Sequence, residues 1–298
     1  MTSEIKISCI IIGHNSAPNL EQLLTSIVQQ NYTNNDIEII YVDNGSSDDS
    51  LKVFHNHPVQ YLKKAVSLSK NIGRMQARLE GVKHAKGTWC LFTNSNIVFK
   101  YNIIYEYNNI IQTSKSSGYS GIVKYDSKDQ FFTKYLNNKN RGSNNLKHLD
   151  FVPFYNVLFS NCIIQTKVMT TIIWNKKFIG YGGEELDFFF LLHAQQSKII
   201  QLCETAIAFR NNHPSYDLHC KRLYEFGFNN FKELEFSLQT LIVKNKFFLR
   251  KILFFKFFLK IITMIIMATY KTKFKKLNFF LIKLGMWSSI LLGYHKSK

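Results

Sequence analysis

The chain has 298 residues, of which 46% are hydrophobic and 19% are charged. This content suffices for one large core or two smaller ones and excludes a disordered or fibrous protein. The net charge of +18 is uneven, because residues 236–298 include 13 Lys or Arg and no Asp or Glu, whereas the rest of the chain carries 25 basic and 20 acidic residues. Because positive and negative charges nearly cancel in residues 1–235, we expect that only the basic tail binds an anionic surface.

Cysteine usage and the N-terminus both favour the cytoplasm. The five cysteines are odd in number, widely scattered and without a CxxC pair, so we expect reduced, structural thiols. The first residues run directly into a strand-like segment, with no basic region and apolar core of the kind that marks a protein for export.

The first hundred residues alternate between predicted strands and helices. Strands are predicted at 5–12, 37–42, 59–62 and 88–93. Helices are predicted after Ser16, which precedes Pro18 as an N-cap, after the turn at 43–48, and from about 69 to 84. This alternation predicts a parallel, doubly wound α/β sheet, whose ligands sit beyond the carboxyl ends of the strands. The loops at 13–16, 43–48 and 94–96 are therefore the candidate binding loops.

The second part of the chain gives weaker signals. Residues 101–150 are rich in Asn, Lys and Ser, and 137–145 is predicted to be a mobile loop. Ordered structure is expected again at 157–165, in an apolar helix at 188–194 and in a short strand at 199–203.

Four segments occur in order at 7–15, 41–48, 71–87 and 182–187. Together they resemble the family 2 glycosyltransferases, especially bacterial members that build surface polysaccharides and glycolipids. Residues 7–15 are similar to the opening strand and loop of the family, and 41–48, with the run Asp43-Asn44-Gly45-Ser46, to its nucleotide-base loop. Residues 71–87 are similar to the helix before its metal motif, and 182–187 to its acidic catalytic motif. The resemblance covers about residues 5–230. It implies a GT-A catalytic domain at 1–230, a Rossmann-like α/β fold, followed by a mainly helical tail at 231–298.

The resemblance implies that the strand-end loops bind a nucleotide-sugar. The residues expected to contact the donor are Gly13, Asn15, Asp43, Asn44, Gly45, Ser46, Arg74, Arg78, Asn94 and Ser95. Asp43 can accept hydrogen bonds from a base and a ribose. Without the other motifs a helix N-cap would be the favoured interpretation, and the resemblance shifts it to nucleotide contact. Arg74 and Arg78 lie one helical turn apart and could meet a diphosphate; the alternative is a solvated basic face.

The metal motif departs from the family pattern. Where relatives carry two carboxylates one residue apart, this chain has Asn94-Ser95-Asn96. Amide oxygens bind Mg²⁺ or Mn²⁺ less well than carboxylates. Three outcomes stay open: a weak metal at Asn96 helped by Glu184 or His213, leaving-group stabilisation by Arg or Lys without metal, or a protein that no longer catalyses transfer. His213 follows Glu185 by 28 residues, where relatives place a metal-site His.

The acidic motif carries the predicted catalytic base. Inverting sugar transfer needs a carboxylate that takes the proton of the acceptor hydroxyl. Glu184 and Glu185 follow two glycines and open a predicted helix. The family pattern assigns the base to Glu185, with Asp187 orienting the acceptor or replacing the base. The alternative is an acidic first turn that only caps the helix.

The basic tail predicts a helix lying on a membrane surface. Lys256 and Lys260 interrupt its apolar run, so no uncharged stretch is long enough for a spanning helix. Lys246, Lys256, Lys260 and Lys271 fall on one side of a helical wheel, as in an interfacial helix whose lysines reach toward phosphate. A two-helix hairpin with a second arm at 279–294 and a helical subdomain packed on the catalytic domain are the alternatives.

Together these features predict an inverting glycosyltransferase on the cytoplasmic face of a membrane. It would move a sugar from a nucleotide-sugar, by family habit a UDP-sugar, to a saccharide or lipid-linked acceptor of the cell envelope. The alternative is a non-catalytic nucleotide-sugar or glycan-binding relative. No nucleic-acid partner is expected, because the tail is rich in Phe, Ile and Leu and no nucleic-acid motif appears.

Overall fold

The computed structural model describes residues 6–32, 36–174, 178–196, 199–243, 261, 265 and 275–297. The chain divides into two compact units, which are described separately. Unit 1 comprises residues 1–126, 136–174 and 191–212, and unit 2 comprises residues 127–135, 175–190 and 213–298.

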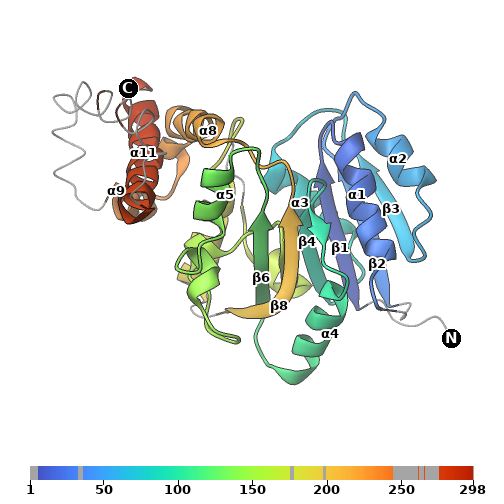
Figure 1. Ribbon diagram of the computed structural model, residues 1–298. Coiled ribbons are helices and arrows are strands. Elements are labelled where there is room, and N and C mark those ends of the chain that lie inside the picture. Colours follow the sequence, from blue (N-terminus) through green and yellow to red (C-terminus); the bar gives the residue numbers. More distant parts are fainter. Residues whose placement is uncertain are drawn as a thin grey trace. The chain divides into compact units, whose positions relative to one another are not determined.

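Unit 1 is built on an eight-stranded sheet with the order β3-β2-β1-β4-β7-β6-β8-β5 (Figure 1). The strands are β1 (Ile7–Gly13), β2 (Ile37–Asp43), β3 (Leu62–Ser67), β4 (Trp89–Asn94), β5 (Val98–Phe99), β6 (Gly118–Tyr125), β7 (Cys162–Gln165) and β8 (Ile200–Arg210). The pairs β1–β2, β2–β3 and β1–β4 are parallel, whereas β7 runs antiparallel to both β4 and β6. The predicted α/β class is confirmed, with a parallel half that carries the predicted loops.

Helices cover both faces of this sheet. They are α1 (Ala17–Val28), α2 (Ser50–Asn56), α3 (Arg74–His84), α4 (Ile103–Thr113) and α6 (Thr166–Thr171). The apolar residues of α1, α2 and α4 form one core with alternate residues of β1 and β2, such as Ile11 and Ile39. On the opposite face, α3 approaches closely because Gly81 has no side chain: a Cβ there would lie 2.6 Å from Ile10 Cγ2. Strands such as β1 and β2, which are buried at every position, are typically continuous runs of β-branched residues.

Unit 2 is largely helical. It contains most of α5 (Gln130–Leu136), the first part of α7 (Glu184–Gln195), and α8 (Tyr216–Asn229), α9 (Phe236–Val243) and α11 (Lys275–Lys296). The helices α8 and α11 pack closely (Figure 1). Just after α8, the ring centroid of Phe231 lies 4.8 Å from that of Tyr294 in α11. None of the described helices combines the length and the apolar run that a membrane span requires.

Several predicted boundaries are wrong, each for a local reason. The third strand occupies Leu62–Ser67 instead of 59–62, because it is a sheet edge carrying Lys63 and Lys64 and lacks an apolar pattern. The third helix starts at Arg74 because Gly73, with φ of +88°, breaks the backbone before it. The last strand continues to Arg210 rather than ending at 203, since its second half pairs with β6.

The weakly patterned middle of the chain is ordered secondary structure. It contains α4, β6 and α5, together with a short 3₁₀ helix at Gly142–Asn145, which lies within the predicted mobile loop. The side chain of Asn137 also bonds both the backbone nitrogen and the carbonyl oxygen of Tyr125, at 2.9 and 2.7 Å. Polar side chains such as Asn137 hold the later part of this segment, whereas α4 buries an apolar face at Ile103, Ile104, Tyr107 and Ile110. No helix or strand was predicted for either part.

Candidate active site

The loops after β1 and β2 interlock at the carboxyl edge of the sheet. Gly13 and Asp43 are register partners, and the backbone nitrogen of Asn44 donates to the carbonyl oxygen of Gly13 at 2.8 Å. Asn15, with φ of +48°, accepts from the backbone nitrogen of Ser47 at 2.8 Å, while its own nitrogen donates to Ser46 Oγ at 2.9 Å. The two loops therefore form one hydrogen-bonded platform.

Asp43 holds its own turn rather than capping a helix. Its side chain is 1% exposed and accepts from the backbone nitrogen of Ser46 at 3.2 Å, from the Ser46 hydroxyl, and from Tyr41 Oη at 3.4 Å. Asp48 instead bonds the first residues of two helices, because it accepts from the backbone nitrogen of Ser50 in α2 at 3.1 Å and from that of Ala17 in α1 at 3.0 Å. The N-cap alternative for Asp43 is thus wrong.

The segment before α3 completes the platform. Asn44 accepts from the backbone nitrogen of Ile72 at 2.9 Å and donates to Asn71 Oδ1 at 3.1 Å. Gly45 lies so close to this segment that a Cβ would stand 2.4 Å from the carbonyl carbon of Lys70. Its φ of +74° also favours glycine, so position 45 admits no other residue without strain.

Arg78 lies under the end of β4, away from solvent. It is 0% exposed, donates from Nη2 to Asn94 Oδ1 at 2.9 Å, and its guanidinium stands 4.6 Å from the centre of the Phe159 ring. Arg74 is half-buried at the start of the same helix. The solvated basic face is therefore wrong for Arg78.

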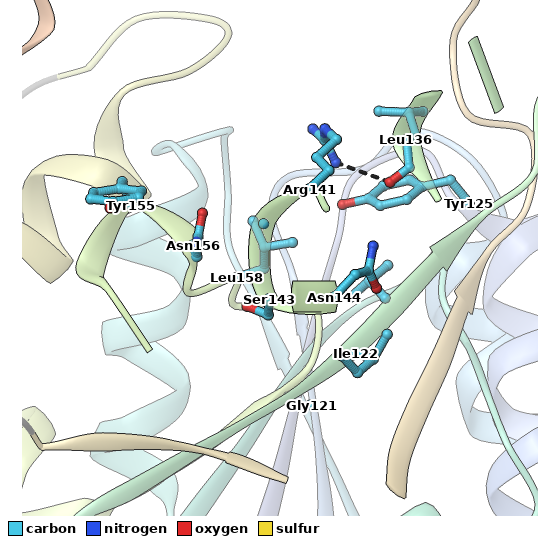
Figure 2. Close-up of a pocket in the computed structure, with 12 residues that line it drawn as sticks. Gly121, Ile122, Tyr125, Leu136, Arg141, Ser143, Asn144, Tyr155, Asn156 and Leu158 are labelled. Atoms are coloured by element: carbon cyan, nitrogen blue, oxygen red, sulfur yellow. Dashed lines mark hydrogen bonds between the residues drawn. The ribbon is translucent and has the colours of Figure 1, made fainter. Parts of the chain in front are cut away.

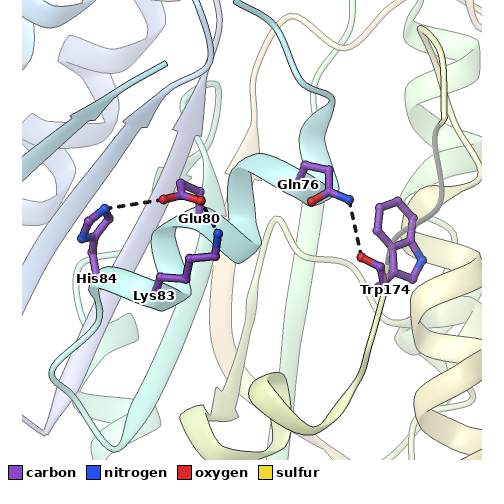
Figure 3. Close-up of polar contacts among 5 residues, drawn as sticks. All are labelled: Gln76, Glu80, Lys83, His84 and Trp174. Carbon is purple, nitrogen blue, oxygen red and sulfur yellow. Dashed lines mark hydrogen bonds and ion pairs between the residues drawn. The ribbon is translucent and has the colours of Figure 1, made fainter. Parts of the chain in front are cut away.

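The outer side of α3 carries different charges (Figure 3). Glu80 lies between Lys83, at 2.7 Å, and His84, at 3.7 Å, and Gln76 donates to the carbonyl oxygen of Trp174 at 3.4 Å. An exposed pair such as Glu80–Lys83 contributes at most about 1 kcal/mol. The charges on this side belong to the surface of the helix, whereas Arg78 belongs to the strand-end platform.

Asn94, Ser95 and Asn96 continue the platform at the end of β4. Ile12 and Asn94 are register partners, and the backbone nitrogen of Ser95 donates to the carbonyl oxygen of Ile12 at 3.0 Å. Ser95 is buried, and Asn94 and Asn96 are half-buried. Unit 1 thus contains all ten residues that were predicted to contact the donor. They lie in the loops at the ends of β1, β2 and β4, except for Arg74 and Arg78 of α3, of which Arg78 contacts Asn94.

The acidic motif lies in unit 2 and begins α7 as predicted. Gly182 and Gly183 have φ of +91° and +97°, and a Cβ on Gly183 would stand 2.5 Å from the Phe226 ring. Asn230 fixes the turn, since its side chain donates to the carbonyl oxygen of Gly182 at 2.8 Å and accepts from the backbone nitrogen of Ile179 at 2.8 Å. Packing against α8 thus explains why both positions are glycine.

The three predicted catalytic carboxylates differ in their surroundings. Glu184 and Asp187 are buried, whereas Glu185 is half-buried. Asp187 Oδ1 accepts from the backbone nitrogen of Glu235 at 3.0 Å and so ties α7 to the start of α9. Of the three, Glu185 is the most accessible to a substrate.

The two residues predicted to hold a metal lie in different units. Asn96 is in unit 1, and His213 is in unit 2, where it is buried with its ring centre 5.8 Å from Phe132 and 5.5 Å from His219. Across the described residues, no group of three or more His, Cys, Asp or Glu side chains is arranged to hold a metal ion. The metal site therefore stays a prediction.

Comparison with known proteins identifies the family. A family model described as glycosyl transferase family 2 matches residues 8–169, which include the whole strand-end platform. The chain belongs to this family. Two curated relatives are a poly(ribitol-phosphate) beta-glucosyltransferase of Bacillus spizizenii, 30% identical over 127 residues, and a cholesterol galactosyltransferase of Borreliella burgdorferi, 33% identical over 87 residues. The matches cover 39% and 29% of this chain but only 20% and 24% of the relatives, so the chain spans far less than their full length.

Solved structures show the same fold at low identity. Residues 1–349 of S. aureus TarS in complex with UDP-GlcNAc match with a TM-score of 0.57 and 15% identity, covering 99% of this chain and 93% of that one. A mannosyltransferase of Pyrobaculum calidifontis, solved with GDP-Man and Mn²⁺, matches with a TM-score of 0.64 and 12% identity, covering 99% and 89%. The fold of this family 2 member is GT-A, as the resemblance implied.

Proposed function

We propose that this chain transfers a sugar from a nucleotide-sugar donor, a UDP-sugar, to a saccharide or lipid-linked acceptor in cell-envelope glycan synthesis. The observation that carries the proposal is the interlocked platform of Gly13, Asp43, Gly45 and Asn94 at the carboxyl edge of the parallel strands. Ligands of doubly wound sheets bind at this edge. The curated relatives act on a ribitol-phosphate polymer and on a lipid, which supports an envelope acceptor.

The donor nucleotide would lie on the loops after β1 and β2. The Asp43 carboxylate, already held by Ser46, retains acceptor capacity for a base N–H or a ribose hydroxyl, because each carboxylate oxygen has two lone pairs. Close packing of Gly45 on Lys70 keeps the loop backbone in a fixed position. TarS was solved with UDP and with UDP-GlcNAc, and the mannosyltransferase with GDP-Man. The choice of uracil as the base follows the habit of the family, and the TarS complexes are in line with it.

A divalent metal fits unit 1 poorly. At the place of the usual carboxylate pair stand two amides, and the oxygen of Asn94 already accepts from the buried cation Arg78. A positive charge beside that oxygen opposes a second cation at the same point. We propose instead that Arg78 and Arg74 supply the positive charge that stabilises the departing diphosphate.

The chemical step is a single displacement with Glu185 as the base. The acceptor hydroxyl oxygen would attack the anomeric carbon while the bond from that carbon to the diphosphate oxygen breaks. The proton of the hydroxyl passes to the Glu185 carboxylate, and the nucleoside diphosphate leaves with the bonding electrons. Attack opposite the leaving group inverts the anomeric centre. Glu185 suits the role because its neighbour Asp187 is occupied by the backbone of Glu235.

Glu185→Gln tests this proposal, because it keeps the shape of the side chain and removes its basicity. Transfer should fall by roughly 10²- to 10⁴-fold while donor affinity is retained. Glu184→Gln is the matched control, since adjacent positions at the start of a helix point about 100° apart. The measurements are initial rates with a panel of UDP-sugars and envelope extracts as acceptor, and donor affinity by calorimetry. If Glu185→Gln turns over as fast as the native protein, Glu185 is not the catalytic base. A native protein that binds donor without transferring it would favour the non-catalytic alternative.

Membrane attachment through the basic tail is part of the proposal. Among described residues of unit 2, Phe236, Leu241 and Phe280 are 66%, 56% and 61% exposed. Lys246, Lys256, Lys260 and Lys271, on which the interfacial helix was predicted, lie outside the described residues. Exposed apolar groups in a part of the sequence that is rich in lysine suit an anionic membrane surface on the cytoplasmic side.

A further inference from the structure

A cavity of unit 1 lies away from the residues that were predicted to contact the donor (Figure 2). Its volume is about 180 Å³, and it is lined by the second half of β6, by the 3₁₀ helix at Gly142–Asn145 and by residues 155–158. Figure 2 shows Tyr155 and Asn156 on one side of this cavity, with Tyr125, Arg141 and Asn144 on the other. It is concave, with a few polar groups on an apolar floor, as ligand sites commonly are.

The lining of this cavity includes one cation, Arg141, and two amides, Asn144 and Asn156. Arg141 Nη1 donates to the carbonyl oxygen of Leu136 at 3.2 Å, and Lys124, which is outside the lining, donates from Nζ to Asn144 Oδ1 at 3.2 Å. None of the twelve described residues that line it is Asp or Glu. The stretch 136–149 contains two Lys, one Arg and no acidic residue. An anionic group entering the cavity would meet donors and no opposing carboxylate.

An exposed aromatic ring stands at the opposite side. Tyr155 is 63% exposed, and its neighbour Asn156 also faces the cavity. An aromatic ring offers an apolar face against which the C–H face of a sugar can pack, while amide side chains bond the hydroxyls. Arg141 and Asn144 on one side, with Asn156 and the exposed Tyr155 ring on the other, suit a sugar with an acidic substituent.

The cavity opens near the edge of the sheet that carries the platform. Because β7 runs antiparallel to both β4 and β6, the strands β4 and β6 point the same way. The carboxyl end of β6 at Tyr125 therefore lies on the same edge as Asn94. Only β7 separates the two strands in the sheet, a lateral distance of about 10 Å. A short oligosaccharide can bridge that distance.

We infer that this cavity is an acceptor subsite, which holds a sugar unit bearing a phosphate or carboxylate at a distance from the reacting hydroxyl. The inference rests on the proposed function, because it assigns the ligand to the acceptor of that transferase. Arg141 binds the anionic group, Asn144 and Asn156 bind hydroxyls, and Tyr155 packs against the ring. The acceptor is thereby narrowed to acidic glycans.

Ligand-observed NMR and calorimetry on the full chain test the inference with four probes: glucose 6-phosphate, glucuronate, methyl β-glucoside and inorganic phosphate. Both anionic sugars should bind more tightly than the neutral glucoside and the free phosphate. Comparing the phosphate and the carboxylate probe shows which acidic group the subsite prefers. Arg141→Gln should weaken the anionic sugars by roughly tenfold to a hundredfold and leave the glucoside unchanged, whereas Arg141→Lys should retain part of the preference.

Tyr155→Ala should weaken all three sugars, and Tyr101→Ala is its matched control, since Tyr101 is 61% exposed in the same unit and does not line the cavity. Circular dichroism checks that each variant is folded. Equal binding of neutral and anionic sugars, binding that Arg141→Gln leaves intact, or no binding at millimolar concentration would overturn the inference. UDP affinity, measured in parallel, should be unchanged in every variant. If the native chain does not bind UDP, that result counts against the proposed function, whatever the four sugar and phosphate probes show.

Discussion

At the scale of single residues, the platform shows how polar side chains divide their tasks. Asp43 and Asp48 lie in one turn, yet Asp43 closes the turn at Ser46 while Asp48 joins the starts of α1 and α2. Arg78 is buried under Asn94 and stacks on Phe159, so the amide at position 94 is the partner of a cation. A carboxylate pair would change the charge balance of this site.

Restoring the carboxylates should restore metal binding in part. In Asn94→Asp combined with Asn96→Asp, two negative charges return, but the one at position 94 will pair with Arg78, so position 96 should supply most of the gain. We expect tighter Mn²⁺ binding in the presence of UDP, measured by calorimetry, with Asn96→Asp alone giving the larger share. Native activity that disappears in EDTA and returns with Mn²⁺ would contradict the metal-independent mechanism.

At the scale of elements, the helical part of unit 2 depends on glycines that permit close packing. A Cβ on Gly227 of α8 would stand 2.0 Å from the carbonyl oxygen of Ile290, and one on Gly293 of α11 would stand 2.1 Å from that of Tyr224. Both contacts are with backbone, which cannot rotate away. The two helices therefore approach at a distance that only glycine allows.

Gly227→Ala should destabilise the protein although alanine is the better helix former. Helix propensity alone would favour alanine by about 1 kcal/mol, but overpacking typically costs about 1–3 kcal/mol and here meets backbone. We expect a melting temperature lower by several degrees, measured by differential scanning calorimetry. Ser237→Ala in α9, at an exposed position, is the control and should change little. An unchanged or raised melting temperature in Gly227→Ala would show that α8 and α11 do not pack in this way.

At the scale of the whole molecule, all five cysteines are buried and free, in agreement with the expectation of reduced, structural thiols. Burial raises the pKa of Cys9 to about 12 and, chiefly by the same cause, that of Cys90 to about 12. Thiols with such pKa values are protonated at neutral pH and react slowly, because the thiolate is the nucleophile. Their inaccessibility adds to this protection.

A thiol reagent should therefore distinguish the native from the unfolded chain. At pH 8 the native protein should react with Ellman's reagent far more slowly than the protein in guanidinium chloride, where all five thiols become accessible. The measurement is the absorbance of released thionitrobenzoate over time. Rapid release of two or more equivalents from the native protein would show that the thiols are open to solvent.

The tail can be tested without deleting it. Removing residues 236–298 would also remove α11, which packs on α8, so any change in binding could result from misfolding or from newly exposed apolar surface of α8. Replacing Lys246, Lys256, Lys260 and Lys271 by Gln leaves that helix in place. Because each lysine near an anionic surface contributes about 1 kcal/mol, co-flotation with phosphatidylserine vesicles should fall strongly, while high salt weakens native binding only in part. If the variant with all four substitutions floats with vesicles as the native chain does, these lysines do not anchor the protein to the membrane.

The sequence by itself determined the parallel half of the sheet and the places of its loops. The apolar runs of β1, β2 and β4 are buried on both faces, so their composition alone predicts strands, and the polar turns that follow them mark the binding edge. Gly182 and Gly183 before two glutamates likewise predicted the start of α7. These signals are local, because each depends on residues within a few positions.

Only the tertiary structure decided which partners these residues have. The burial of Arg78, the bond from Glu235 to Asp187 and the contact of Gly45 with Lys70 join positions that lie far apart in the chain. The strand β6 and the cavity beside it carry no periodic signal, because Gly118 and Gly121 have no side chains and their space is filled by β7 and β8. Long-range packing, which a linear pattern does not encode, assigned these segments their structure.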